Sequence, residues 1–231
     1  NLRLGLNAGN SIVSGGNYNV VVGDEAGTAI TTGDYNVAVG YSALKTEDAH
    51  GKNVAVGAEA LEALDAGADS YNVAVGYQAG NDLTSGIQNT LVGGLAGDVL
   101  TDADYNVAVG VSALGTDTLG SKSVAIGYSA LTAQNFTTAT DTYNTAVGYG
   151  AGMAVTTGEQ NTIIGGLSGD AITTGGLNVA IGMHSLGANT VGSRATALGY
   201  SALLAQNPAT AVNTYNTAAG YEAGLSITTG I

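Results

Sequence analysis

Apolar residues alternate with small ones in a short stretch that returns along the whole chain. Residues 35–44 read YNVAVGYSAL, and close variants stand at 71–80, 105–114 and 123–131. In each variant a glycine follows an apolar residue, Val or Thr lies two places before that residue, and Ala usually lies between them. Residues two apart share one face of a β-strand, so the pattern predicts a short strand before each glycine. Because Ala leaves the second face apolar as well, we expect the strand to be buried on both faces.

The glycine that closes each strand marks the turns of a repeat. Eight of the twelve spacings between successive marker glycines are 17 residues, and the others are 18, 19, 21 and 21. The marker glycines are Gly5, Gly23, Gly40, Gly57, Gly76, Gly93, Gly110, Gly127, Gly148, Gly165, Gly182, Gly199 and Gly220. Repeats of this length indicate a solenoid whose turns stack on one another.

We therefore expect an all-β fold, a parallel β-roll or β-solenoid of about 13 turns of 17–21 residues. The repeat forms one continuous region over residues 1–231. Because it is interrupted in mid-phrase at both ends, we expect a segment of a longer fibrous chain.

A slower period appears four places after each marker glycine, a position written +4. Two turns with Gly at +4 alternate with two turns with Leu, which makes a unit of four turns and about 71–72 residues. Turns with Gly at +4 carry an aliphatic residue at +7, namely Ile12, Ile30, Leu83, Leu100, Val155, Ile172 and Ile227. Turns with Leu at +4 are polar at +7 except for Leu64, and the polar residues are Glu47, Asp117, Gln134, Asn189 and Gln206. We interpret the alternation as two fillings of the same core volume.

Two further features recur once per four-turn unit. A basic residue precedes one strand, at Lys52, Lys122 and Arg194. Extra residues follow Gly57, Gly127 and Gly199 and predict inserted loops on one side of the solenoid.

An asparagine stands before most of the predicted strands. Stacked at one strand spacing, these amides are expected to hydrogen-bond from turn to turn as a ladder, the alternative being that each makes only a local turn. The ladder residues are Asn19, Asn36, Asn53, Asn72, Asn89, Asn106, Asn144, Asn161, Asn178 and Asn216. All twelve tyrosines fall in two columns, one before this asparagine and one after the marker glycine.

The phrases SVAIG at 123–127 and NVAIG at 178–182 resemble the head repeats of trimeric autotransporter adhesins. Runs of the NVAVGYQA type, as at 72–79, are similar to repeats of phage tail-fibre proteins. The resemblance covers essentially the whole chain. It implies a left-handed parallel β-roll, three chains about a common axis, and an extracellular role as a surface adhesin or receptor-binding fibre. The turns are longer than the usual head repeat, and the four-turn unit is not part of the family pattern.

Composition narrows the function classes. Of 231 residues, 45% are hydrophobic and 10% charged, which is too apolar for a disordered chain. Eighteen acidic against five basic residues give a net charge of −13, which argues against nucleic acid or an anionic membrane as partner. The absence of cysteine excludes disulfides, thiolate metal sites and a cysteine nucleophile. No apolar run has the length of a membrane span, so no direct membrane insertion is expected.

Candidate chemistry is sparse, and we expect no enzyme activity, no cofactor and no metal. No P-loop, zinc-protease or nucleophile-elbow motif occurs. His50 and His184 lie in distant turns and are interpreted as solvated, the alternative being a ring about a trimer axis. The acidic pairs are interpreted as solvated loop charge, with weak Ca²⁺ binding as the alternative. These pairs are Asp24 with Glu25, Glu47 with Asp48, and Asp102 with Asp104.

The sequence thus predicts a non-enzymatic structural or adhesive fibre segment, located extracellularly on a cell surface or virion. Its expected partners are two further copies of itself, which would cover the Ala-rich face, and a host-surface glycan or protein receptor. The alternative for that face is contact with the second layer of the same roll. The other function hypotheses are a self-assembling structural filament and, more remotely, an ice-binding solenoid or a hexapeptide-type acyltransferase.

Candidate ligand contacts lie on the inserted loops, because an exposed aromatic residue beside amides suits a sugar ring. They are Gln134, Asn135, Phe136, Gln206, Asn207 and Pro208.

Overall fold

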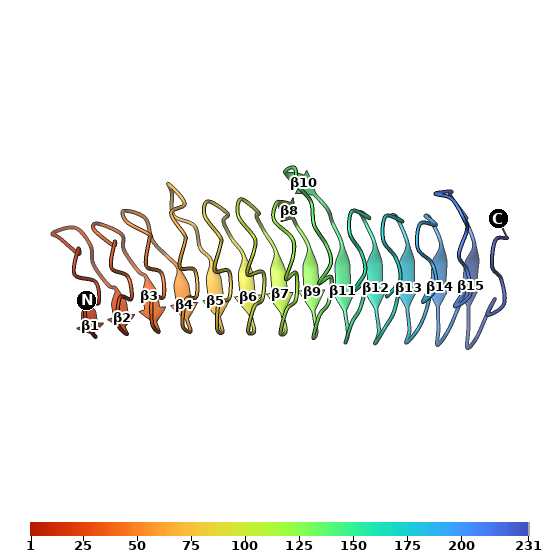
Figure 1. Cartoon of the computed structure of the whole chain (residues 1–231), viewed down its shortest axis with the longest axis horizontal. Coiled ribbons are helices and arrows are strands. Elements are labelled where there is room, and N and C mark those ends of the chain that lie inside the picture. Colours follow the sequence, from red (N-terminus) through yellow and green to blue (C-terminus); the bar gives the residue numbers. More distant parts are fainter. Residues whose placement is uncertain (231) are drawn as a thin grey trace. The chain divides into compact units, whose positions relative to one another are not determined.

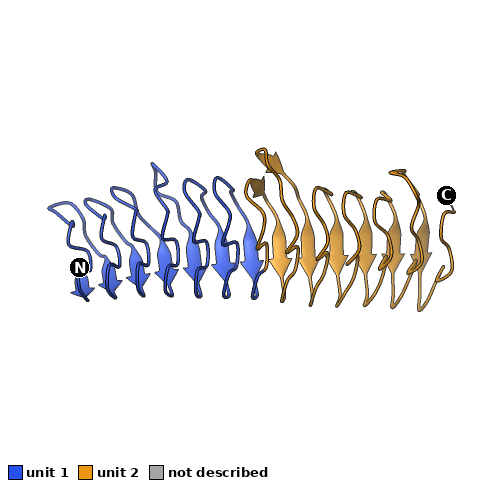
Figure 2. Ribbon diagram, in the orientation of Figure 1, with its two compact units in different colours: residues 1–112 blue, residues 113–231 orange. Residues whose placement is uncertain are grey.

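The computed structural model describes residues 1–230 and contains β-strands joined by turns and loops. The chain divides into two compact units, Asn1–Ser112 and Ala113–Ile231 (Figure 2). Each unit is a parallel β-solenoid in which every turn contributes one short strand to a sheet (Figure 1). Together the units hold about 13 turns, as the marker glycines predict. No helix able to span a membrane occurs among residues 1–230.

The strands have the length that the pattern predicts. The first unit holds β1 (Leu2–Leu4), β2 (Val20–Val22), β3 (Val37–Val39), β4 (Val54–Val56), β5 (Val73–Val75), β6 (Thr90–Val92) and β7 (Val107–Val109). The second holds β9 (Val124–Ile126), β11 (Thr145–Val147), β12 (Thr162–Ile164), β13 (Val179–Ile181), β14 (Thr196–Leu198) and β15 (Thr217–Ala219). Successive strands of a unit pair in parallel with equivalent residues opposite one another, such as Ala38 with Ala55. Every column of the sequence pattern is therefore a column in space.

The middle residue of each strand points into the solenoid. Ala38, Ala55 and Ala180 are fully buried within a single chain, whereas the residues on either side of them are half-buried or exposed. In the second unit Ala180 and Ala197 share a core cluster with Leu186 and Leu203, which are the +4 residues of the returning half-turn. The expectation that both strand faces are buried is therefore wrong for the single chain. Companion chains do not shield the Ala face either, because the solenoid's own second layer covers it.

The alternation of Gly and Leu at +4 follows from the backbone and the core together. Position +4 has a positive φ in both kinds of turn, for example 51° at Gly27 and 49° at Leu44. A Cβ added to Gly27 would lie 2.7 Å from Cδ1 of Ile30, the buried residue at +7 of the same turn. Leu61 with Leu64, which are both buried, is the exception to this exclusion. Where the +7 side chain fills this volume in the other turns, +4 is glycine. Where it does not, a buried leucine such as Leu44 takes its place.

The asparagine column links successive turns. The backbone N–H of Asn36 donates to Oδ1 of Asn19 at 2.8 Å, and that of Asn53 donates to Oδ1 of Asn36 at 3.0 Å. The Asn19 amide group also donates to the Gly33 carbonyl of its own turn at 2.7 Å. The same backbone-to-side-chain bond is donated by Asn72, Asn89, Asn106, Asn161 and Asn178. Most bonds of the ladder are therefore donated by a backbone N–H and accepted by the side-chain oxygen of the asparagine one turn earlier. They satisfy polar groups in the core that would be costly to leave unpaired.

The inserted loops are partly ordered by the turns beneath them. In the second unit, β8 (Gly120–Ser121) and β10 (Thr140–Asp141) form a separate parallel pair outside the main row of strands (Figure 1). Ser193 and Asn213 form the equivalent single bridge in the following four-turn unit. The sequence pattern did not predict this second pairing, because the inserted residues lack apolar alternation.

Candidate functional site

The inserted loops bury most of the side chains that we expected to contact a ligand. Gln134, Phe136, Gln206 and Pro208 are buried, and Phe136 is only 5% exposed. The expectation of an exposed aromatic residue is therefore wrong. Asn135 and Asn207 are exposed, so a contact with a ligand stays a prediction for these two residues.

The buried loop residues have a structural role that accounts for their burial. Gln134 donates from Nε2 to Oδ2 of Asp117 at 2.6 Å and to Oγ of Ser123 at 2.9 Å. Its Oε1 accepts a hydrogen bond from Nδ2 of Asn144 at 2.9 Å. Gln206 makes the corresponding bond to Asn216 at 2.9 Å. These amides satisfy polar groups in the core beneath the loop.

A shallow hollow of about 360 Å³ lies beside the last inserted loop. It is lined by Ser193, Ala211, Val212 and Asn213. None of these four side chains ionises, so the hollow offers no general acid or base.

The outer face of the sheet is an apolar feature at the surface of each unit. We call it the open face, and it consists of the first and third residues of the strands β2 to β7 and of β9 and β11 to β15. These residues are Val, Thr, Ile, Leu and one Ala, without a charged side chain. Ile126, Ile164, Ile181 and Leu198 are each 37–38% exposed. The open face is therefore an apolar stripe that the single chain leaves half-covered.

Tyrosine columns flank the open face at both ends of the strands. Tyr18 and Tyr35 stack with ring centroids 4.9 Å apart, and Tyr128 and Tyr149 stack at 5.3 Å. The basic residue of each four-turn unit lies over the ring of the tyrosine that precedes the following strand, with Lys52 Nζ 5.0 Å from the centroid of Tyr71. The corresponding pairs are Lys122 with Tyr143 and Arg194 with Tyr215. The stripe is thus bordered by aromatic rings, which are enriched at protein interfaces.

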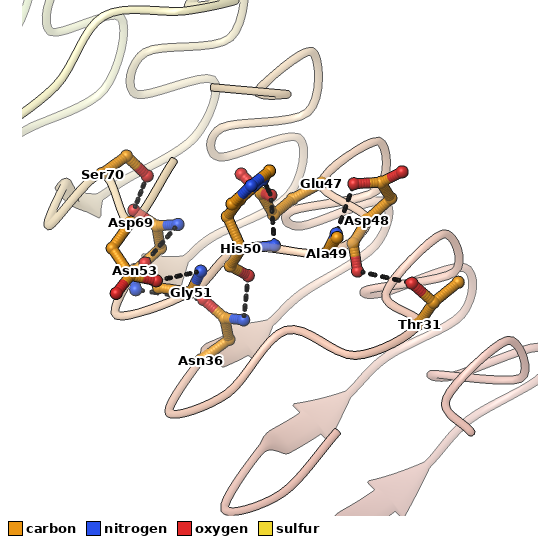
Figure 3. A network of polar contacts seen from close by, with 10 residues as sticks. All are labelled: Thr31, Asn36, Glu47, Asp48, Ala49, His50, Gly51, Asn53, Asp69 and Ser70. Carbon is orange, nitrogen blue, oxygen red and sulfur yellow. Dashed lines mark hydrogen bonds and ion pairs between the residues drawn. The ribbon is translucent and has the colours of Figure 1, made fainter. Parts of the chain in front are cut away.

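A second feature is a group of ionisable side chains near the inserted loop of the first unit. Glu47, Asp48, His50 and Asp65 each place one potential ligand atom within 4.8 Å of the others. We call this group the acid–histidine cluster. Oε1 of Glu47 accepts the His50 backbone N–H at 3.2 Å and lies 3.6 Å from the His50 ring Nδ1 (Figure 3).

Glu47 differs from the other three members in its burial. Its side chain is fully buried, and Oε2 has no hydrogen-bond partner. Burial raises the pKa of the Glu47 carboxyl, the backbone amides of His50 and Ala66 partly oppose this, and the nearby Asp65 charge adds to it. The interpretation of Glu47 as solvated loop charge is therefore wrong.

Glu47, Asp48 and His50 stand out in the sequence, but Asp65 was not predicted to join them. Asp65 lies one turn later, at the position next to +7, and the turn spacing alone predicts that it lies above Asp48. The signal that could have found it is the coincidence of acids at equivalent positions of neighbouring turns.

Comparison of the chain with known protein families, curated proteins and solved structures gives no match.

Proposed function

We propose that this chain is a non-enzymatic structural segment of an extracellular fibre, such as an adhesin head or tail-fibre shaft. Its copies associate through the open face. One observation carries the proposal: an uncharged aliphatic stripe remains half-exposed on the outer side of the sheet in each unit. Soluble monomers rarely leave a contiguous apolar patch of this kind, and such patches mark interaction surfaces.

A second copy of the chain is the occupant that fits the stripe. The columns of the open face repeat at the strand spacing, so an identical stripe offers side chains at a matching period. The chain carries a net charge of −13, yet the open face has no acidic residue, so two copies can meet there without opposing like charges. Aliphatic side chains bordered by tyrosines resemble the composition of oligomer interfaces. Cyclic symmetry closes such an assembly, and the resemblance to trimeric adhesins favours three copies.

The test is the mass of the protein under native conditions, measured by light scattering across a range of concentrations. We expect a discrete trimer for the wild-type chain and a monomer for the double variant Ile126→Lys, Ile181→Lys. Both isoleucines are already 37–38% exposed, so lysine at these positions is compatible with the fold of the single chain.

The matched control is Asn135→Lys together with Asn207→Lys, which adds the same charge at exposed positions outside the open face. We expect this control to remain trimeric. A wild-type chain that is monomeric at every concentration would overturn the proposal. A ladder of masses would instead favour the purely structural filament.

A further inference from the structure

We propose that Glu47, Asp48, His50 and Asp65 bind a divalent transition-metal ion, with Zn²⁺ as the fitting ion. The ligand atoms of these four side chains lie within 4.8 Å of one another. Two atoms in the cluster are buried and lack hydrogen-bond partners, namely Oε2 of Glu47 and Nδ1 of His50. A buried carboxylate oxygen is costly to leave unpaired, so this pair of atoms points to a bound cation.

In the later four-turn units, the residues equivalent to Glu47 have all their polar side-chain atoms hydrogen-bonded within the protein. Asp117 and Asn189 occupy the position of Glu47 in the later four-turn units. Oδ1 of Asp117 accepts the backbone N–H groups of Gly120 at 3.2 Å and Phe136 at 3.0 Å. Asn189 exchanges two bonds with the backbone of Gly192, at 2.9 Å and 3.1 Å. Both residues are satisfied by the protein itself, whereas Glu47 is not.

The difference in hydrogen bonding between Glu47 and Asp117 originates in the following turn. Oδ2 of Asp117 accepts a bond from Gln134 at 2.6 Å. The residue equivalent to Gln134 above Glu47 is Leu64, which has no donor. Leu64 is fully buried. Besides the backbone amides of His50 and Ala66, the carboxylate of Glu47 has Asp48, His50 and Asp65 as its ionisable neighbours.

Asp48 and Asp65 stand where the later four-turn units have two residues that hydrogen-bond to each other. In the last four-turn unit, Thr190 occupies the position of Asp48 and donates from Oγ1 to Oδ1 of Asn207, the equivalent of Asp65, at 2.8 Å. Thr118 and Asn135 make the same contact at 3.4 Å. In the acid–histidine cluster both partners are carboxylates. Like charges at facing positions of neighbouring turns repel, so a cation between them would relieve the repulsion.

The position of His50 also differs between the four-turn units. Its equivalents in the later units are Gly120 and Gly192, which contribute only backbone bonds. At this position an imidazole therefore appears only in the four-turn unit that also has the unpaired Glu47 oxygen and the facing Asp48 and Asp65. The substitutions that distinguish this place from its repeats each add a metal ligand or remove an internal donor.

No basic side chain neutralises the cluster among residues 1–230. Lys45 pairs with Glu25 at 2.8 Å and lies 3.7 Å from Glu62. Lys52 pairs with Asp69. Three carboxylates therefore share one histidine, and a divalent cation would balance most of their charge.

The donor set selects the class of metal. One imidazole nitrogen with carboxylate oxygens suits Zn²⁺ or a similar transition ion, whereas Ca²⁺ prefers oxygen ligands alone. Ligand atoms about 2 Å from a tetrahedral zinc lie about 3.4 Å from one another, so modest side-chain movement would complete the geometry. Asp48 and Asp65 are exposed and have the freedom to make this movement. The bound ion would tie two successive turns together near the first inserted loop.

The test is calorimetric titration of the chelator-treated full chain with ZnCl2, with MnCl2 and CaCl2 in parallel. We expect one Zn²⁺ per chain, tighter binding of Zn²⁺ than of Ca²⁺, and a higher melting temperature with Zn²⁺. Glu47→Gln and His50→Gly are each expected to weaken Zn²⁺ binding by about tenfold or more. Leu64→Gln restores the internal donor of the later repeats, so it should also weaken Zn²⁺ binding.

His184→Gln and Asp102→Asn are the matched controls, and we expect unchanged Zn²⁺ affinity for both. Circular dichroism verifies that each variant is folded. If Glu47→Gln does not fold, the partly exposed His50 and the exposed Asp65 remain as the test sites, through His50→Gly and Asp65→Asn. Absence of Zn²⁺ binding, binding unaffected by His50→Gly, or a preference for Ca²⁺ over Zn²⁺ would each overturn the proposal.

Discussion

Single atoms decide how closely successive turns of this solenoid stack. The marker glycine Gly93 has a φ of 140°, and a Cβ built on it would lie 2.5 Å from the carbonyl oxygen of Gly110 in the next turn. That position therefore requires glycine for two separate reasons, backbone conformation and contact distance. Its neighbour Gly94 has no positive φ, and a Cβ added there would meet nothing within 4 Å.

These adjacent glycines give a sharp prediction. Gly93→Ala should lower the free energy of unfolding by at least about 2 kcal/mol, because it combines a strained φ with overlap against backbone that cannot yield. Gly94→Ala is the control and should leave stability nearly unchanged. Chemical denaturation of both variants measures the difference. Equal stability of the two would show that the turns do not stack as closely as described.

A second residue affects how stability depends on pH. Oδ1 of Asp98 is buried without a hydrogen-bond partner, and burial raises the pKa of its carboxyl above the ordinary value. The folded chain therefore holds this proton more tightly than the unfolded chain. It follows that the contribution of Asp98 to stability falls as pH rises from the ordinary carboxyl pKa through the raised value.

Asp98→Asn should accordingly raise the melting temperature near neutral pH, where the wild-type carboxylate is charged. The gain should shrink as pH falls below the ordinary carboxyl pKa, because the carboxyl is then protonated in both states. Glu159→Gln, at an exposed position, removes the same charge and serves as the control for the net charge of the molecule. An equal gain for both variants near neutral pH would mean that overall charge, and not the burial of Asp98, is responsible.

Among the structural elements, the ladder shows how a repeat compensates for a missing member. Ser123 stands where most turns have asparagine, and its Oγ contacts both Gln134 Nε2 at 2.9 Å and the Thr142 hydroxyl at 2.5 Å. The equivalent residue in the last four-turn unit is Ala195, which offers no side-chain oxygen. Gln206 Nε2 instead makes one longer bond there, of 3.3 Å, to Thr214.

Ala195→Ser should therefore stabilise the protein by about 1 kcal/mol, the usual net value of a buried hydrogen bond with partners already in place. Ala197→Ser is the control, because Ala197 lies in an apolar core cluster and a hydroxyl there is expected to be destabilising. Thermal denaturation of the two variants provides the measurement. A loss of stability in Ala195→Ser would contradict the proposed equivalence of the two inserted loops.

The strands also show how far sequence reasoning reaches. Spacing and alternation predicted the strand positions, their register and the number of turns, because each column repeats with little variation. They did not show which strand face lies inside, because a three-residue strand with Val and Ala is apolar on both faces. The inward direction is decided by the +4 leucines of the returning half-turn, such as Leu186, which pack against Ala180 and leave room only for small side chains.

The burial of side chains in the inserted loops was not predicted, for a different reason. Phe136 lies in inserted residues without a period, and the polar +7 residue Gln134 was assigned to the same loop, which was expected to project into solvent. Their burial depends on Asp117 one turn earlier. Its carboxylate accepts hydrogen bonds from the backbone N–H of Phe136 and from Nε2 of Gln134. A contact of this kind is visible only once residues separated by a full turn are placed together.

In the molecule as a whole, uncharged and acidic side chains lie on different surfaces, and each surface has its own proposed function. The acidic excess of the chain is absent from the open face, where copies are proposed to meet. The acid–histidine cluster belongs to the first unit and is built from two successive turns. The association of copies and the binding of metal can therefore be tested independently, since Ile126→Lys with Ile181→Lys and His50→Gly alter different surfaces.

The contact made by the marker glycines bears on how such a gene changes its length. Gly76 and Gly148 each approach the carbonyl of the glycine one turn ahead, with built-Cβ distances of 2.3 Å and 2.5 Å. A chain that lost residues 77–148 would bring Gly76 to the turn that Gly148 now meets, with leucine and glycine still in sequence at the core. Recombination between like periods thus keeps the marker glycines and the alternation at +4 in register. A crossover out of phase would instead break the alternation of two glycine turns with two leucine turns.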